Sequence, residues 1–268
     1  LWLDHAAIWA NDEAHLPPVD ISKLPVNPPT AGWEALHNGS ASDKIVDVPG
    51  TVEEHYWGEI GGAVPDTGGD YIGVSWWSRK FTVASGMEGK RIRLHFESVN
   101  LRAEVFVNGK LVGYDVVGNT PFEVDATDAI IFGEENTLDV RITDPVGNFS
   151  WNDNILMRWG ENLVPAVHGF GGITGPVTLI ASDQVHVTDI YVQNQPDPKK
   201  VRVFVTLKNN TDSVQKGTLD LALHEYGNSS AVVWESMLLG EISPSGTNTF
   251  EFEADVPEAK LWELAGYK

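Results

Sequence analysis

Residues 91–113 read RIRLHFESVNLRAEVFVNGKLVG and contain the clearest pattern in the chain. Over Arg91–Glu97, apolar residues alternate with polar ones, which is the period of a strand with one buried face. An apolar run over 103–107 then leads into Asn108-Gly109, and a second apolar run follows. Asn-Gly between such runs predicts a two-residue hairpin, because a type I′ turn needs positive φ at both positions. The stretch therefore predicts antiparallel β-structure.

The same alternation recurs further along the chain. Strands are expected at 138–142, 176–180, 185–192, 201–208, 219–223 and 250–253. No amphipathic helix of about ten or more residues is recognisable. Short strands separated by turn-rich segments are typical of β-sandwiches, so the chain is predicted to be all-β. A boundary near residues 181–184 predicts two domains, 1–182 and 183–268.

Two segments lack strand periodicity. The first sixty residues are rich in proline, which predicts an extended arm wrapped over a domain. Trp2, Trp9 and Trp33 are its expected anchors. The second segment, Thr143–Gly172, is rich in aromatic residues, whereas disordered linkers are poor in them. Because loops this long inside compact domains are usually functional or disordered, we predict an ordered functional loop.

Composition narrows the function. The chain has 268 residues, with 38 acidic and 18 basic side chains and a formal net charge of −20. Such a charge repels phosphate backbones and anionic lipids, so neither nucleic acid nor a membrane is an expected partner. Cysteine is absent, which excludes disulfides and thiolate chemistry. Because the sequence starts at Leu1 without a signal-like segment, we interpret it as a mature or trimmed chain, and favour a periplasmic or secreted bacterial protein over a cytoplasmic one.

Six motifs follow one another over roughly residues 45–185. They are Tyr71-Ile-Gly73-Val-Ser-Trp76-Trp77-Ser-Arg79-Lys80-Phe81, Phe96-Glu97-Ser-Val99, Val105-Phe-Val107-Asn108-Gly109 with Val112-Gly113, Thr120-Pro121-Phe122-Glu123-Val124-Asp125-Ala-Thr127, Glu135-Asn136-Thr137-Leu138, and Gly171-Gly172-Ile173-Thr-Gly175-Pro176-Val177. In this order the series resembles the N-terminal part of glycoside hydrolase family 2. Each motif alone is weakly specific, and their common order makes the resemblance specific.

The resemblance implies an all-β fold, with a jelly-roll β-sandwich followed by an immunoglobulin-like β-sandwich. The family calls the first of these the sugar-binding domain. In the family, a TIM barrel with two catalytic glutamates comes next, and residues 1–268 contain no counterpart of it. The chain thus resembles the non-catalytic N-terminal portion of β-galactosidase-, β-glucuronidase- or β-mannosidase-like enzymes. Its end, from Val256-Pro257 to Trp262, resembles the point just before the last strand of the second sandwich, so that strand is expected to be lacking.

Two loops carry the residue mixture of a sugar site, in which aromatic faces cover C–H surfaces and polar groups bind hydroxyls. They are residues 53–70 and the long loop 143–172. In the resembled enzymes, loops from these regions complete the glycone pocket of the barrel. The candidate substrate-binding residues are Asp70, Trp151, Asp153, Trp159 and His168. The family usually has an aspartate where this chain has Ala166, and His168 is a candidate substitute.

No catalytic residue is expected in the chain itself. Retaining glycoside hydrolysis needs two carboxyl groups about 5–5.5 Å apart. The adjacent pairs Glu53-Glu54 and Glu134-Glu135 are interpreted as solvated surface acids, because neighbours on a strand point to opposite faces. Two alternative functions stay open, a stand-alone carbohydrate-binding module and a structural or adhesion pair of sandwiches.

No cofactor is expected, and no residues are spaced as metal ligands. Aspartate-rich loops of β-sandwiches can hold calcium or sodium, so a bound ion of this kind is left open. The expected partners are a carbohydrate substrate and the protein's own C-terminal TIM barrel. A homo-oligomer is also left open.

The expected lack of a final strand is testable by extension. Continuing the polypeptide past Lys268 through that strand should raise the melting temperature, because pairing would cover an open sheet edge. An unchanged melting temperature in the longer polypeptide would count against the missing strand.

Overall fold

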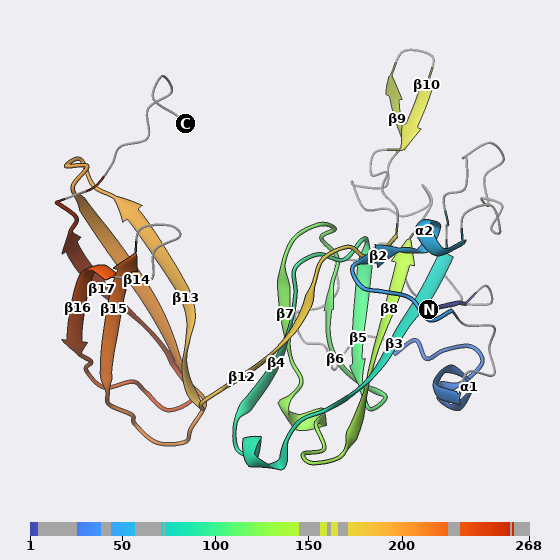
Figure 1. Cartoon of the computed structure of the whole chain (residues 1–268), viewed down its shortest axis with the longest axis horizontal. Helices are drawn as coiled ribbons and strands as arrows, with labels where there is room; N and C mark the ends of the chain where they lie inside the picture. Colours follow the sequence, from blue (N-terminus) through green and yellow to red (C-terminus); the bar gives the residue numbers. More distant parts are fainter. Residues whose placement is uncertain are drawn as a thin grey trace. The chain divides into compact units, whose positions relative to one another are not determined.

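The protein is described by a computed structural model that divides into two compact units, Leu1–Ala181 and Ser182–Lys268 (Figure 1). The described residues are 1–4, 26–38, 44–56, 71, 73–144, 156–159, 162–165, 171–224, 231–257 and 259. Among these residues, no helix is both long enough and apolar enough to cross a membrane. Strands dominate both units, which confirms the prediction of an all-β protein built from sandwiches.

Unit 1 contains a large sheet of five strands. Their order in the sheet is β1 (Trp2–Leu3), β3 (Gly73–Thr82), β8 (Glu135–Asp144), β5 (Arg102–Val107) and β6 (Lys110–Asp115). All neighbouring pairs are antiparallel, and β3 pairs with β8 from Gly73–Asp144 to Thr82–Glu135 without a register shift. The β3–β8 pair is therefore a regular ladder along the whole length of the sheet.

A smaller sheet of three strands faces the large one. Its order is β12 (Val177–Ser182), β4 (Arg91–Phe96) and β7 (Phe122–Asp125). Two further pairs are β2 (Gly50–Thr51) with β11 (Gly172–Ile173), and β9 (Leu156–Trp159) with β10 (Asn162–Pro165). The helices among the described residues of the unit are short: α1 (Trp33–Asn38), α2 (Val52–Tyr56), and the 3-10 turns η3 (Ser85–Met87) and η4 (Thr127–Ala129).

The core of unit 1 fills the space between these two sheets. Alternate residues of the strands supply it, because successive side chains of a strand point to opposite faces. Its buried members include Trp77, Leu94, Phe96, Val105 and Val140. On β4 and β8, these buried residues are the apolar positions of the alternating patterns at 91–97 and 138–142. Both predicted strands are confirmed.

The opposite face of the large sheet is also buried. The N-terminal arm covers it, and Trp33 of α1 meets Trp76 and Phe106 edge-on with ring centroids 5.4 and 5.2 Å apart. Trp2 and Leu36 pack on the same cluster. Trp76 therefore lies under the arm while its neighbour Trp77 lies in the core. The expected anchoring by Trp2 and Trp33 is confirmed, and Trp9 lies outside the described residues.

Under the arm lies a buried ionic cluster. Arg141 Nη1 donates to Glu104 Oε2 at 2.7 Å, and Arg102 Nη2 lies 3.6 Å from Glu104 Oε1. The three side chains expose 2%, 0% and 4% of their surface, in the order Arg141, Glu104, Arg102. Asn27 of the arm also donates to Glu104, at 3.4 Å. The single carboxylate thus neutralises two buried cations and contacts the arm.

The expected hairpin is present between β5 and β6. Asn108 and Gly109 have φ values of 51° and 75°, as a type I′ turn requires. The N-terminal region is rich in proline and has no helical periodicity, so neither of its two helices could be recognised in the sequence. Both are short and stabilised by packing, so α1 and α2 were not predicted.

Unit 2 contains a sheet of three strands opposite a pair. The order in the first is β13 (Val185–Asn194), β14 (Lys200–Asn209) and β17 (Thr247–Asp255), and the pair is β15 (Thr218–His224) with β16 (Ala231–Leu238). Val203, Val205 and Phe252 meet Leu219 and Met237 between them. The sequence predicted these strands except β16. On edge strand β13, Val185 packs on the core, whereas Ile190 and Val192 point to the same side and stay exposed, at 57% and 47%.

Removal of the shared carboxylate tests the ionic cluster. Glu104→Ala should lower the free energy of unfolding of unit 1 by about 3 to 5 kcal/mol, because it removes the carboxylate that two buried guanidinium groups share. Urea denaturation monitored by tryptophan fluorescence measures this.

The matched control is Glu135→Ala, which breaks an exposed ion pair with Lys80 on the same sheet. This substitution should lower the free energy of unfolding by less than about 1 kcal/mol. Equal losses in the two variants would show that the buried cluster contributes no more than a surface pair.

Candidate functional site

The two predicted sugar-site loops are anchored at one end of unit 1. Residue 57 follows α2 and residue 145 follows β8, while β3 and β11 begin after the loops. Gly73 pairs with Asp144, and Thr51 pairs with Gly172. Val52 N donates to Gly171 O at 2.8 Å. The described residues that flank segments 57–70 and 145–170 therefore lie side by side, at the α2 end in Figure 1.

The predicted site residues themselves fall mostly outside the description. Asp70, Trp151, Asp153 and His168 lie outside the described residues. Trp159 ends β9, where it pairs with Asn162 of β10, and its side chain is not described. Part of the long loop is thus a β-hairpin. The assignment of these five residues to a sugar site stays a prediction.

Glu53 corrects one interpretation from the sequence. It exposes only 1% of its surface, and its Oε1 accepts a hydrogen bond from Tyr71 N at 2.9 Å. The interpretation of Glu53 as a solvated surface acid is wrong, because the residue belongs to helix α2 rather than to a strand and its side chain points inward. Glu54, Glu134 and Glu135 are exposed as predicted.

Tyr71 joins α2 to the start of β3 by hydrogen bonds to Glu53 and Val74, at the end of unit 1 that carries the two loops. It is 5% exposed, and its hydroxyl donates to Val74 O at 2.9 Å. Burial raises the pKa of the phenol, and the negative charge of Asp4 raises it further, with a smaller effect from Asp144. The hydrogen bond to Val74 lowers the pKa and offsets only part of the rise. The phenol therefore stays protonated and fixes the start of β3 beneath the loops.

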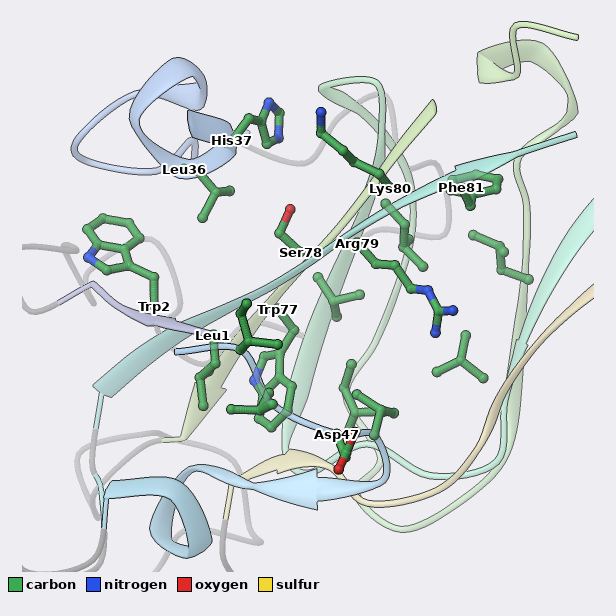
Figure 2. Close-up of a pocket in the computed structure, with 18 of the residues that line it drawn as sticks. Leu1, Trp2, Leu36, His37, Asp47, Trp77, Ser78, Arg79, Lys80 and Phe81 are labelled. Carbon is green, nitrogen blue, oxygen red and sulfur yellow. The ribbon is translucent and has the colours of Figure 1, made fainter. Parts of the chain in front are cut away.

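A cavity of about 1000 Å³ opens on another side of unit 1, along β3 (Figure 2). Its lining residues come from the arm, from segment 44–48, from the second half of β3 and from the two sheets. They are Leu1, Trp2, Leu36, His37, Lys44, Ile45, Val46, Asp47, Val48, Trp77, Ser78, Arg79, Lys80, Phe81, Thr82, Leu94, Leu138, Val140, Ile173, Val177 and Leu179. The cavity thus reaches from the covered face of the large sheet into the sandwich.

Two residues that line this cavity, His37 and Ser78, share a buried partner, Asp139. His37 Nε2 lies 2.9 Å from Asp139 Oδ2, and Ser78 donates to Asp139 Oδ1 at 2.5 Å. A nucleophilic serine needs its hydroxyl bound to the histidine, which acts as the base. Here both groups bind the carboxylate instead. These hydrogen bonds therefore link α1 to β8. The hydroxyl of Ser78 is not bound to His37, as it would be in a nucleophilic serine.

The described residues contain no group of three His, Asp or Glu side chains placed to share a metal ion. The calcium or sodium ion that the sequence leaves open stays a prediction.

Comparison with known proteins agrees with this picture. Residues 29–181 match the family described as glycosyl hydrolases family 2, sugar binding domain. A β-galactosidase of Thermoanaerobacter pseudethanolicus is 34% identical over 128 residues, which are 46% of this chain and 16% of that protein. The β-galactosidase BoGH2A of Bacteroides ovatus is 27% identical over 247 residues, which are 87% of this chain and 26% of that protein. The chain therefore spans only a minor part of the length of these relatives.

Solved structures share the fold. A β-glucuronidase of Bacteroides uniformis covers 82% of this chain with a TM-score of 0.64 at 20% identity, over 25% of its own length. A glycosyl hydrolase family 2 member from Bacteroides cellulosilyticus covers 96% with a TM-score of 0.57 at 23% identity, over 31% of its own length. The fold is thus shared with these enzymes, and the matched family model assigns residues 29–181 to the class of β-sandwich sugar-binding domains. The chain belongs to glycoside hydrolase family 2, and residues 29–181 are its sugar-binding domain.

The raised pKa of Tyr71 predicts an alkaline effect on stability. The unfolded phenol loses its proton near pH 10, about the ordinary value, while the folded one holds it to higher pH. Stability from this group is therefore constant below pH 10 and falls above it, by up to about 1.4 kcal/mol per pH unit. The loss caused by Tyr71→Phe should accordingly shrink as the pH rises above 10, as measured by urea denaturation.

The control is Tyr191→Phe in unit 2, which removes a hydroxyl from a side chain that is 55% exposed. The same measurements on this variant give the effect of removing a hydroxyl from an exposed phenol. A constant difference between Tyr71→Phe and the unaltered protein would contradict a buried, protonated phenol.

Proposed function

We propose that this chain is the non-catalytic N-terminal portion of a family 2 glycoside hydrolase acting on β-linked glycosides. Residues 1–182 form a jelly-roll domain with its extended arm, and residues 183–268 form an immunoglobulin-like sandwich. Together they support a C-terminal TIM barrel that holds the catalytic glutamates. The loops of the jelly roll reach the glycone pocket of that barrel.

One observation carries the proposal, the pairing of the loop anchors. Gly73 with Asp144 and Thr51 with Gly172 bring the ends of two loops, far apart in sequence, to one end of unit 1. These loops contain the aromatic and acidic residues predicted for sugar contact. A rigid ladder below the loops suits the task of presenting them to a separate catalytic domain.

The buried carboxylates of unit 1 support a non-catalytic role. Glu104 is paired with two arginines, and Asp139 accepts hydrogen bonds from Ser78 and contacts His37. Asp4 accepts from Trp76 Nε1 at 3.2 Å and from Thr30 N at 2.9 Å. A general acid needs an open approach to the glycosidic oxygen. These carboxylates are instead held by structural partners.

The substrate class follows from the relatives. Their names include β-galactosidase and β-glucuronidase, which share the β-linkage and differ in the sugar. We therefore propose a β-linked glycoside as substrate and leave the identity of the sugar to the barrel. A carbohydrate ligand and the barrel are the proposed partners.

Activity of the isolated chain and of a longer polypeptide tests the proposal. The 268 residues alone should not hydrolyse nitrophenyl β-galactoside or β-glucuronide, whereas the polypeptide continued through a barrel should hydrolyse a β-glycoside. In the longer protein, Trp159→Ala or Asp70→Ala should raise KM by about tenfold, the value of one lost charged or packed contact. Steady-state kinetics measures both effects.

Asp128→Ala is the matched control, because Asp128 is exposed in η4, near the start of β4 and away from the loop anchors. It should leave KM unchanged. Turnover by the 268 residues alone would refute the non-catalytic role. Tight oligosaccharide binding by them alone would favour a carbohydrate-binding module, and no sugar binding even in the longer protein would favour a structural pair of sandwiches.

A further inference from the structure

The three-stranded sheet of unit 2 has an outer face that points away from the core. Val203 and Val205 of β14 are buried in the core, so Phe204 between them points to the opposite face. The strand register places Tyr191 of β13 on one side of Phe204 and Glu251 of β17 on the other. Tyr191 and Phe204 therefore lie next to each other on the outer face.

The two aromatic rings form one apolar surface that is open to solvent. Their centroids are 5.9 Å apart, and their planes are inclined by 30°. Tyr191 exposes 55% of its surface, and Phe204 is half-buried. A phenol this exposed gains little hydrophobic stabilisation from folding, because much of its surface stays in water. Its apolar surface is therefore available to a ligand.

Polar side chains lie on both sides of the aromatic pair. On β14 the positions two before and two after the phenylalanine are Arg202 and Thr206, and on β13 the corresponding positions beside the tyrosine are Gln193 and Asp189. The register pairs Gln193 with Arg202, and Asp189 with Thr206, so all four belong to the outer face. Amide, hydroxyl and carboxylate groups thus flank an apolar centre.

The charges on this face compensate one another. Arg202 Nε lies 2.9 Å from Glu251 Oε1, and Arg202 Nη2 donates to Glu253 Oε1 at 2.9 Å. The basic side chain nearest to the aromatic pair is therefore held by two carboxylates. The charged residues of the outer face are Lys200, Arg202 and Lys208 with Asp189, Glu251, Glu253 and Asp255. Basic groups do not outnumber acidic ones, so the face does not attract an anionic ligand.

We propose that the outer face of this sheet binds a neutral β-linked polysaccharide. The C–H groups of its pyranose rings cover the aromatic surface of Tyr191 and Phe204. Its hydroxyls bond to Gln193, which can donate and accept, and to Asp189, which accepts. This site belongs to unit 2 and is additional to the sugar contacts proposed for the loops of unit 1.

Other classes of ligand fit this face less well. Nucleic acids and uronate-containing glycans are anionic, and both the net charge of −20 and the carboxylates of Glu251 and Glu253 oppose them. An apolar protein surface would bury the side chains of Gln193 and Asp189 without hydrogen-bonding partners. A neutral glycan offers C–H surface and hydroxyls together, which is the combination that this face presents.

Binding to this face is expected to be weak. A flat sheet contacts a ligand on one side only, so a short oligosaccharide should have a Kd on the order of 1 mM. This weak binding differs from the tight oligosaccharide binding that would identify a carbohydrate-binding module.

Affinity electrophoresis of the 268-residue chain tests the proposal. Native gels contain β-1,4-galactan, β-1,4-mannan or hydroxyethyl cellulose as neutral β-linked polysaccharides, and carboxymethyl cellulose as the anionic control. At least one neutral polysaccharide should retard the chain, and carboxymethyl cellulose should bind at least about tenfold more weakly. This comparison does not depend on the folding of any variant.

Three variants locate the site. Tyr191→Ala removes one of the two rings and should weaken binding of the neutral polysaccharide at least about tenfold. Tyr191→Phe keeps the ring and should bind as the unaltered chain does. The matched control is Ile190→Ala, which removes a 57% exposed side chain from the same strand on the opposite face of the sheet. It should leave binding unchanged, and all three variants should melt as cooperatively as the unaltered protein.

Several results would overturn the proposal. These are no retardation by any of the three neutral polysaccharides, binding of carboxymethyl cellulose as strong as that of the best neutral polysaccharide, or equal binding by Tyr191→Ala and Ile190→Ala. Binding lost in Trp159→Ala and kept in Tyr191→Ala would also overturn it and would assign the sugar to the loops of unit 1. A dimer in sedimentation equilibrium that Tyr191→Ala abolishes would show a protein interface instead.

Discussion

Burial of the large sheet on both faces is the constraint on which the rest of unit 1 depends. Every residue of β5 is buried, because the sandwich core covers one face and the N-terminal arm covers the other. Polar side chains on such a sheet need hydrogen-bonding or ionic partners within the protein. Each buried polar group without a partner would lower the stability by several kcal/mol. Glu104 meets this requirement with Arg102 and Arg141, and Asp4 meets it with Trp76 and Thr30.

These buried contacts link the arm to the loop end. Asp4 holds the arm to Trp76 on β3, and the same carboxylate raises the pKa of Tyr71, two residues before β3 begins. Glu53 accepts from Tyr71 N on the side of α2. The chain thus fixes the start of β3 from two directions, below the segments in which the sugar contacts are predicted. A rigid base for two loops fits the proposed role of presenting them to a separate catalytic domain.

Much of this fold could be predicted from the sequence, and the exceptions have physical causes. Alternation in Arg91–Glu97 and the Asn108-Gly109 turn depend on local geometry, and both are confirmed. Glu53 could not be placed, because a five-residue helix leaves no period to recognise and its burial depends on Tyr71, eighteen positions away. The cavity along β3 is lined by segments that are far apart in the sequence, so no local pattern predicts it.

Hydrogen exchange measured by mass spectrometry, with and without residues 1–38, tests most directly whether the arm closes the large sheet. In the full chain, amides of Arg102–Val107 and of the centre of β8 should be among the slowest to exchange, because both strands are internal and covered on each face. Removal of the arm should abolish this protection. Equal protection in the two proteins would contradict the account, because it would show that the outer face of the sheet needs no cover.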